Sequence, residues 1–337
     1  MMRLVIATPL YPPEIGGPAT YAKLLCDGLP ARDINVELVK FSDVKKLPKI
    51  IRHYAYYRRV LKAARDADVI LALDPVSVGL PAMKAAQKLR KPFVVKIVGD
   101  YAWEQGVQRF GITQSLDDFV KTRRVPFQVR MLRRVQTRVA MSATRVIVPS
   151  EYLKNIVITW GVSEEKISVI YNSTELPAHI PTHNKNAGEF LIVSAGRRVP
   201  WKGFEAIEST AQEHANWRVF IASGLSHEET IGKIRSADVF VLNSSYEGLS
   251  HVLIEALSLG VPIVATNIGG NPEVITNEEN GLLIPAGSTQ ALSNALERIA
   301  SDSELRARLS ANALESAKRF FVETMLLRTS DILKNII

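Results

Sequence analysis

The sequence predicts two doubly wound α/β domains that face each other across a cleft, and three observations lead to this prediction. Short β-branched, apolar runs alternate with amphipathic helical stretches along the chain. These runs are continuously hydrophobic, which is typical of strands buried on both faces of a parallel sheet. The 337 residues are enough for two domains, each with its own core.

The first half contains six strand-like runs separated by five helical patterns. The predicted strands are 3–8, 36–41, 69–73, 93–98, 145–148 and 168–171. The predicted helices are 18–29, 46–65, 77–90, 117–142 and 150–160. Because strand and helix alternate, a parallel sheet with crossover helices is expected over residues 1–172.

The second half repeats this architecture after a segment without hydrophobic periodicity. That segment, residues 173–189, is rich in Pro, Asn and Thr and is predicted to be the linker. The predicted strands are 191–195, 218–222, 239–243, 261–265 and 281–284. The predicted helices are 203–213, 226–236, 250–259, 288–300 and 302–317. A second domain is therefore expected over residues 190–318.

Composition and charge narrow the classes of partner. Cys26 is the only cysteine, which excludes an internal disulfide and fits a reducing cytoplasm. No apolar run approaches the roughly 20 residues that span a bilayer. Residues 1–180 hold 28 Lys/Arg against 16 Asp/Glu, whereas residues 181–337 hold 14 against 18. The first half is therefore expected to face an anionic partner.

Gly16 and Gly17 follow the first predicted strand and open the first helix. Glycines at this place let the backbone approach a ligand closely, and a helix N-terminus favours an anion. A plain tight turn is the alternative interpretation, and the pair of glycines alone does not decide between them.

Arg197 and Lys202 lie directly after the predicted strand 191–195, at the entry to the next helix. Two cations at this place are suited to hold a diphosphate. Solvated surface charge is the competing interpretation, and the position at the end of a strand favours the diphosphate. Arg198, between them, is interpreted as a bystander.

Glu247 and Glu255 flank the start of the helix that follows the strand 239–243. Glu255 lies in an apolar segment, where a carboxylate is costly unless it is paired or bound to a ligand. Two glutamates eight residues apart can accept hydrogen bonds from two parts of one elongated ligand. The backbone amides of Leu249 and Ser250, after Gly248, can bind phosphate.

Asp100 follows the fourth predicted strand, next to Gly99. In the functional interpretation, the aromatic rings of Tyr101 and Trp103 line a site for a sugar ring. In the alternative, which remains open, Asp100 is a turn residue and the two aromatic side chains belong to the core. No histidine lies with Cys or Asp at the spacing of metal ligands, so no metal site is predicted. The absence of a P-loop, a nucleophile elbow and a complete Gly-x-Gly-x-x-Gly argues against kinase, hydrolase and dinucleotide-binding functions.

The segment 121–138 contains seven basic residues and an apolar stripe at helical spacing. The basic residues are Lys121, Arg123, Arg124, Arg130, Arg133, Arg134 and Arg138, and the stripe is Phe127, Met131, Leu132, Val135 and Val139. Such a helix is suited to an anionic membrane surface. A helix packed on its own sheet with a solvated basic face remains open. No nucleic-acid-binding module is recognisable, and nucleic acid is not predicted as a partner.

Taken together and in this order, these motifs resemble the GT-B glycosyltransferases of glycosyltransferase family 4, over nearly the whole chain. The resemblance rests on Pro12-Pro13-Glu14-Ile15-Gly16-Gly17, on Arg145 to Ser150 with Val169 to Asn172, on Gly196-Arg197 with Lys202-Gly203, and on Glu247 with Glu255 followed by a Gly-Val-Pro-Ile-Val-Ala strand. It implies transfer of a sugar from a nucleotide-diphosphate sugar to a hydroxyl of a glycan or lipid-linked acceptor. It also implies retention of configuration without a metal or other cofactor, and a final helix in 319–337 that crosses back onto the first domain.

The resemblance also implies roles for the residues singled out above. Arg197 and Lys202 would stabilise the leaving diphosphate. Glu247 would bind the hydroxyls of the donor sugar, and Glu255 the ribose. Gly16 and Gly17 would face the phosphate or the acceptor, and Asp100 would lie near the reacting centre. A cytoplasmic enzyme, peripheral at the inner membrane face, is expected.

The chain departs from the family pattern in three places. Gly99-Asp100 stands where many members have a histidine, and Phe320-Phe321-Val322 replaces the usual Phe-Ser-Trp. After Val219–Gly224 the chain reaches the strand at 239 without the further helix and strand that the family places beside the base. This shortening keeps one alternative open, a non-enzymatic or degenerate nucleotide-sugar-binding protein of the same fold.

Overall fold

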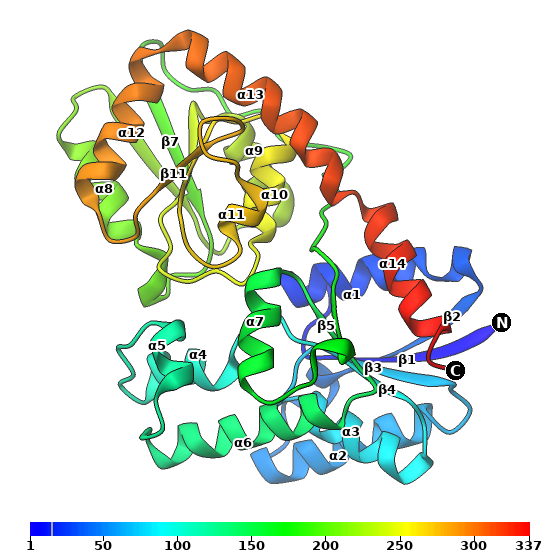
Figure 1. Cartoon of the computed structure of the whole chain (residues 1–337). Helices are drawn as coiled ribbons and strands as arrows, with labels where there is room; N and C mark the ends of the chain where they lie inside the picture. Colours follow the sequence, from blue (N-terminus) through cyan, green and yellow to red (C-terminus); the bar gives the residue numbers. More distant parts are fainter. Residues whose placement is uncertain (15) are drawn as a thin grey trace. The chain divides into compact units, whose positions relative to one another are not determined.

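The computed structural model describes residues 1–14 and 16–337 and divides the chain into two compact units (Figure 1). Unit 1 comprises Met1–Asn172 together with Val322–Ile337, and unit 2 comprises Ser173–Phe321. Each unit is built around one parallel β-sheet with helices packed against it.

Unit 1 contains a six-stranded sheet in the order β2-β1-β3-β4-β5-β6, in which every neighbouring pair is parallel. Its strands are β1 (Met2–Thr8), β2 (Ile34–Lys40), β3 (Val69–Ala72), β4 (Phe93–Lys96), β5 (Arg145–Val148) and β6 (Ile167–Val169). The central strands β3 and β4 are buried along their whole length, as their uninterrupted apolar sequences predict.

Eight α-helices cover this sheet within the described residues. They are α1 (Gly17–Gly28), α2 (Lys49–Ala63), α3 (Gly79–Leu89), α4 (Tyr101–Arg109), α5 (Leu116–Lys121), α6 (Phe127–Ser142), α7 (Glu151–Thr159) and α14 (Val322–Lys334). Helix α14 belongs to unit 1 although it ends the chain, because Met325, Leu326 and Leu333 share a core cluster with α1 and the sheet. The predicted return of the final helix to the first domain is thereby confirmed.

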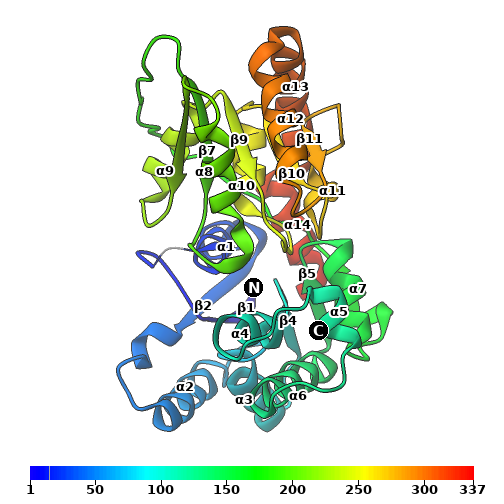
Figure 2. The same ribbon diagram turned by 90° about the vertical axis from the view of Figure 1, so that its left-hand side faces the viewer.

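Helices α2, α3 and α6 lie side by side on one face of this sheet, with α3 packed between the other two (Figures 1 and 2). Helices α1 and α14 pack on each other and belong to the core cluster of the sheet. Unit 1 therefore has the three-layer arrangement that crossover connections between parallel strands impose.

Unit 2 contains a five-stranded parallel sheet in the order β11-β10-β9-β7-β8. Its strands are β7 (Phe190–Ala195), β8 (Trp217–Ala222), β9 (Val239–Leu242), β10 (Ile263–Thr266) and β11 (Leu282–Ile284). Its helices are α8 (Phe204–Gln212), α9 (His227–Arg235), α10 (His251–Ser258), α11 (Asn271–Val274), α12 (Thr289–Ser301) and α13 (Ser303–Ala317). Residues 173–189 contain no helix or strand.

All eleven predicted strands are present within the described residues, whereas one predicted helix was wrong and two helices, α4 and the short α11, were missed. The single helix expected over 117–142 is two helices, α5 and α6, with a break at 122–126. Pro126 has no N–H to donate and fits the N-terminus of a new helix, which explains the break. Helix α4, which directly follows Asp100, was not predicted at all.

Candidate active site

The predicted site residues of both units follow the carboxyl ends of parallel strands. In unit 1, Gly16 follows β1 and Asp100 follows β4. In unit 2, Lys202 follows β7 and Glu247 follows β9. Because all strands of a parallel sheet end at the same edge, each set gathers at one edge of its own sheet.

Lys202 and Glu247 form an ion pair in unit 2. Lys202 Nζ donates to Glu247 Oε1 over 2.5 Å, and the two side chains are only 14% and 11% exposed. Lys202 is the last residue of the short helical turn Pro200–Lys202. Its side chain packs against Gly196, where an added Cβ would lie only 3.2 Å from Lys202 Cε. A glycine at the end of β7 therefore makes room for the lysine side chain, and the predicted cation and carboxylate meet.

The loop that carries Glu247 is fixed from two sides. Ser244 Oγ donates to Glu247 Oε1 over 2.7 Å, and the backbone N–H of Gly270 donates to the Glu247 carbonyl over 3.1 Å. A Cβ on Gly270 would lie 2.2 Å from the Gly248 carbonyl oxygen, so only glycine permits this approach. Ser245 is also bound, because its N–H donates to the Trp201 carbonyl over 2.8 Å. Glu247 is therefore held in a rigid backbone setting.

Glu255 is buried in helix α10 and makes its contacts through one oxygen. Glu255 Oε1 accepts a hydrogen bond from Thr174 Oγ1 over 3.2 Å and lies 3.0 Å from His227 Nε2. The residue is 6% exposed, as the apolar sequence around it predicts. Both contacts are made by Oε1, and no hydrogen bond to Oε2 is found among the described residues. The Glu255 carboxylate raises the pKa of His227.

The remaining unit 2 residues differ in exposure. Gly248, Leu249 and Ser250 are buried, and Ser250 is the N-cap residue of α10. Arg197 is exposed and forms no ion pair with a described residue, so its side chain can turn toward an anion. Arg198 pairs weakly with Glu208 at 3.9 Å, both on the surface, which agrees with its interpretation as a bystander.

In unit 1, Gly16 and Gly17 form the N-terminus of α1. Gly16 is the N-cap residue with φ of +147°, and no side chain caps this end of the helix. A Pro follows at the second helical position and has no N–H, so the Gly17 amide is the first that this terminus offers. Ile15, part of the glycine-loop motif, lies outside the described residues.

Asp100 is the N-cap residue of α4. Its Oδ1 accepts a hydrogen bond from the Trp103 N–H over 2.9 Å, and the residue is 1% exposed. Burial raises the pKa of Asp100, against the opposing effect of these hydrogen bonds and of Arg133 nearby. Trp103 is 3% exposed and its Nε1 donates to the Gln114 carbonyl, so its ring lies in the core and does not present a face for a sugar.

The two roles open to Asp100 are separable by substitution. Asp100→Ala removes the cap and should lower the free energy of unfolding by about 1 kcal/mol, whereas Asp100→Asn keeps the accepting oxygen and should stay within about 0.5 kcal/mol of wild type. Denaturant unfolding measures both. Loss of sugar transfer in the folded Asp100→Asn protein is what the predicted catalytic role requires, and unchanged transfer would assign Asp100 to capping alone.

The basic segment 121–138 is only partly available to a partner. Arg133 donates to the carbonyls of Thr122 and Phe119, at 2.7 and 2.9 Å, and thereby joins α5 to α6. Val139 is buried in the core, so the apolar stripe is not continuous on the surface. Phe127 and Met131 are exposed, at 63% and 41%.

The described residues contain neither a helix that could span a membrane nor a cluster of metal-binding side chains. No helix among them is both long enough and apolar enough to pass through a bilayer. No group of three or more His, Cys, Asp or Glu among them is placed to hold a metal ion.

Several residues of this site were not identified from sequence. Thr174 lies in the linker and His227 opens α9, and neither position carries a motif. Ser244 and Gly270 support Glu247. The glycine pair 269–270 in the loop after β10 was a usable signal, since a pair of glycines after a strand also drew attention to Gly16 and Gly17.

Known glycosyltransferases are similar to this chain in sequence and in fold. Residues 28–173 match the family model described as glycosyl transferase 4-like domain, and residues 205–316 match that of glycosyl transferases group 1. The D-inositol 3-phosphate glycosyltransferase of Saccharomonospora viridis is 38% identical over 109 residues, which are 32% of this chain and 24% of that protein. The chain thus matches only about a quarter of the length of that relative.

Two further proteins are similar over more of the chain. The capsular polysaccharide biosynthesis glycosyltransferase CapM of Staphylococcus aureus is 24% identical over 86% of this chain and 87% of its own length. The structure of HepE of Anabaena in complex with UDP-glucose has a TM-score of 0.76 at 18% identity, and covers 99% of this chain and 100% of that one. The chain therefore has the GT-B fold, and its residues 28–173 and 205–316 are each similar to one glycosyltransferase domain model.

Proposed function

We propose that this protein is a glycosyltransferase that moves a sugar from a nucleotide-diphosphate sugar to a hydroxyl of a glycan or lipid-linked acceptor. The observation that carries the proposal is the arrangement of Lys202, Glu247 and Glu255 at the carboxyl edge of the unit 2 sheet. A buried carboxylate with an open oxygen and a buried ion pair are costly for a fold to maintain, and a polar, anionic ligand would use both.

Each residue receives a role from its chemistry. Lys202, with the exposed Arg197, would neutralise the charge that grows on the leaving diphosphate. The Glu247 carboxylate would accept a hydrogen bond from a hydroxyl of the donor sugar. Glu255 Oε2 would accept a hydrogen bond from a ribose hydroxyl. The backbone of Gly248, Leu249 and Ser250 would bind phosphate at the start of α10. Gly16, Gly17 and Asp100 would serve the acceptor side.

The finer features of the reaction are part of the same proposal. Transfer with retention of configuration and without a metal follows from the family resemblance, with a cytoplasmic enzyme peripheral at the inner membrane face. UDP-sugars are the first donors to test, because HepE was crystallised with UDP-glucose. Glycan or lipid-linked acceptors are supported by relatives such as CapM, which is named for capsular polysaccharide biosynthesis.

Thermal unfolding in the presence of nucleotides tests the donor site. A ligand that binds only the folded protein stabilises it by RT ln(1 + [L]/Kd), which is about 2.7 kcal/mol at one hundred times Kd. We expect one of UDP, GDP, ADP or TDP, with its sugar conjugates, to raise the melting temperature at millimolar concentration. The nucleotide-sugar that gives the rise should then be consumed when an acceptor is added.

The outcomes separate the proposal from its alternative. Binding without release of nucleotide, over a panel of glycan and lipid acceptors, would favour the non-enzymatic nucleotide-sugar-binding protein. No stabilisation by any nucleotide would contradict both assignments of the unit 2 site.

A further inference from the structure

Three helices on one face of unit 1 carry no negative charge. Helices α2, α3 and α6 together span 42 residues and contain 11 Lys/Arg but no Asp or Glu. The whole chain has 34 acidic residues among 337, so about four would be expected in a stretch of this size. Since surface helices normally mix both signs of charge, this face has an unusually uniform positive field.

The outward sides of these helices display most of those cations. The exposed basic residues outside any ion pair with a described residue are Arg58, Lys62, Lys84, Lys88, Arg130, Arg134 and Arg138. Arg59 and Arg133 are not among them, because Arg59 pairs with Asp43 and Arg133 binds backbone carbonyls. Seven unpaired cations therefore remain on the three-helix face.

Large apolar side chains lie exposed on the same face. They are Ile51 and Tyr54 on α2, and Phe127, Met131 and Met141 on α6, each 41% to 63% exposed. These five belong to the eleven large hydrophobic side chains that are exposed among the described residues. On α6, the spacing of Phe127, Arg130, Met131, Arg134 and Arg138 puts apolar and basic side chains on one stripe.

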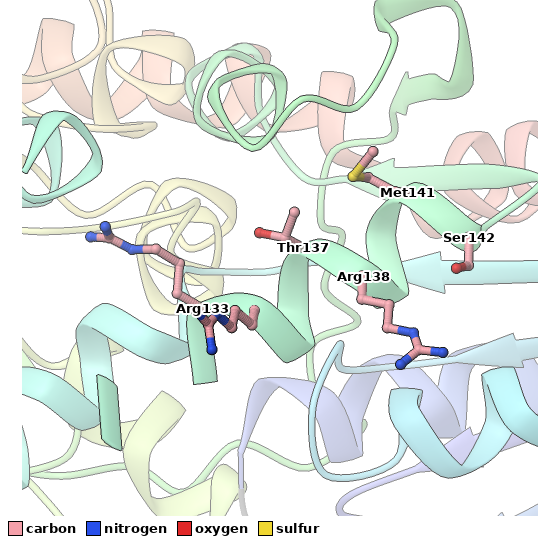
Figure 3. A pocket seen from close by; sticks show the side chains of 6 residues that line it. Arg133, Thr137, Arg138, Met141 and Ser142 are labelled. Carbon is pink, nitrogen blue, oxygen red and sulfur yellow. The ribbon is translucent and has the colours of Figure 1, made fainter. Parts of the chain in front are cut away.

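A shallow, open depression lies on α6. It is bordered only by residues of this helix, namely Arg133, Arg134, Thr137, Arg138, Met141 and Ser142 (Figure 3). The guanidinium groups of Arg134 and Arg138 are donors that can bind phosphate oxygens, and Met141 adds apolar surface beside them, whereas Arg133 is already bound to backbone carbonyls. This composition matches a phospholipid, which joins a phosphate to hydrocarbon.

We propose that the face formed by α2, α3 and α6 docks on an anionic phospholipid bilayer. Its cations would contact lipid phosphates, and Phe127, Met131, Ile51 and Tyr54 would enter the boundary between headgroups and acyl chains. Nucleic acid and acidic proteins match the charge but leave the exposed aliphatic side chains in water. The proposal extends the prediction for 121–138 to the two neighbouring helices, and it does not depend on the donor site in unit 2.

Sedimentation with vesicles tests this proposal on the full chain. Wild type should bind vesicles of phosphatidylcholine and phosphatidylglycerol, and should bind pure phosphatidylcholine at least about tenfold more weakly. Arg130→Glu/Arg134→Glu should lower the partition coefficient on anionic vesicles by about 30-fold or more, because each basic residue near such a surface contributes about a factor of five. Phe127→Ser/Met131→Ser should lower the binding that persists in 0.5 M NaCl, where surface charge is screened.

A matched control lies on another face of the same unit. Arg328 and Lys334 are exposed on α14 and form no ion pair with a described residue, so Arg328→Glu/Lys334→Glu changes the net charge equally and should leave vesicle binding near wild type. Arg130→Gln/Arg134→Gln provides a milder pair if the reversal impairs folding. Equal losses in the α6 and α14 pairs would overturn the proposal, as would binding to RNA or acidic protein without binding to anionic vesicles.

Discussion

Lys202→Ala should reduce the kcat/KM of sugar transfer by at least about 100-fold. The substitution removes a cation from the predicted diphosphate site, and loss of one preorganised electrostatic contact typically costs a factor of 100 to 1,000. It also leaves Glu247, whose side chain is 11% exposed, without its ion-pair partner. Breaking such a pair lowers the free energy of unfolding, here by about 3 kcal/mol. Steady-state kinetics and denaturant unfolding measure the two effects.

Two further variants separate catalysis from stability. Lys202→Ala/Glu247→Gln should recover most of the lost stability, because no unpaired charge remains buried, but should not recover transfer. Arg198→Ala is the matched surface control, since Arg198 is 63% exposed and its contact with Glu208 is 3.9 Å long. It should stay within about 0.5 kcal/mol and a few-fold in kcat/KM of wild type. Transfer within tenfold of wild type in folded Lys202→Ala would rule out the assigned role.

Strands were predicted more accurately than helices for a physical reason. The central strands β3, β4, β9 and β10 are buried on both faces, so each appears in the sequence as an uninterrupted apolar run, whereas the edge strands β2 and β8 are partly exposed. Helix α4 gives a weaker signal, because only Ala102, Trp103 and Gly106 of its nine residues are buried. Its one clear mark was Asp100 as a capping residue, which was interpreted either as a site residue or as an aspartate in a turn, and not as the start of a helix.

The helix break at 122–126 was predictable from local chemistry. Pro126 cannot continue a helix that begins at Leu116, but it is well suited to the N-terminus of the next one. The break also brings α5 within reach of α6, where Arg133 donates to the carbonyls of Thr122 and Phe119.

The partners within the site were beyond prediction from one sequence. Lys202 and Glu247 are 45 residues apart, and Thr174 and Glu255 are 81 apart. Such contacts arise from the order of strands in the sheet, in which β9 and β7 are neighbours. Residue type and place at a strand end indicated candidate side chains, but only the fold shows which of them are in contact.

Glu255→Gln should weaken binding of the nucleotide by about 10- to 100-fold while the protein stays folded. Glutamine keeps an oxygen that can accept from Thr174 and His227, so the internal contacts survive. The other carboxylate oxygen, Oε2, is replaced by an NH2 group that donates hydrogen bonds and cannot accept them. The substitution therefore removes the charged acceptor proposed for the ribose hydroxyls. Calorimetric titration with the nucleotide identified by thermal unfolding gives the affinity. Thr174→Val is the control, because it removes one contact to Oε1 but leaves the charge and should cost less than tenfold.

The same variant has a second signature in the pH dependence of stability. Glu255 raises the pKa of His227 in the folded protein, so their pairing contributes stability that is fully present below the ordinary histidine value of 6.5 and is lost as pH rises through the folded value. The stability advantage of wild type over Glu255→Gln should therefore be larger at pH 5.5 than at pH 9, as measured by denaturant unfolding. An advantage that does not change with pH would contradict the pairing with His227. Unchanged nucleotide affinity would instead contradict the ribose role, so the two assignments of Glu255 fail independently.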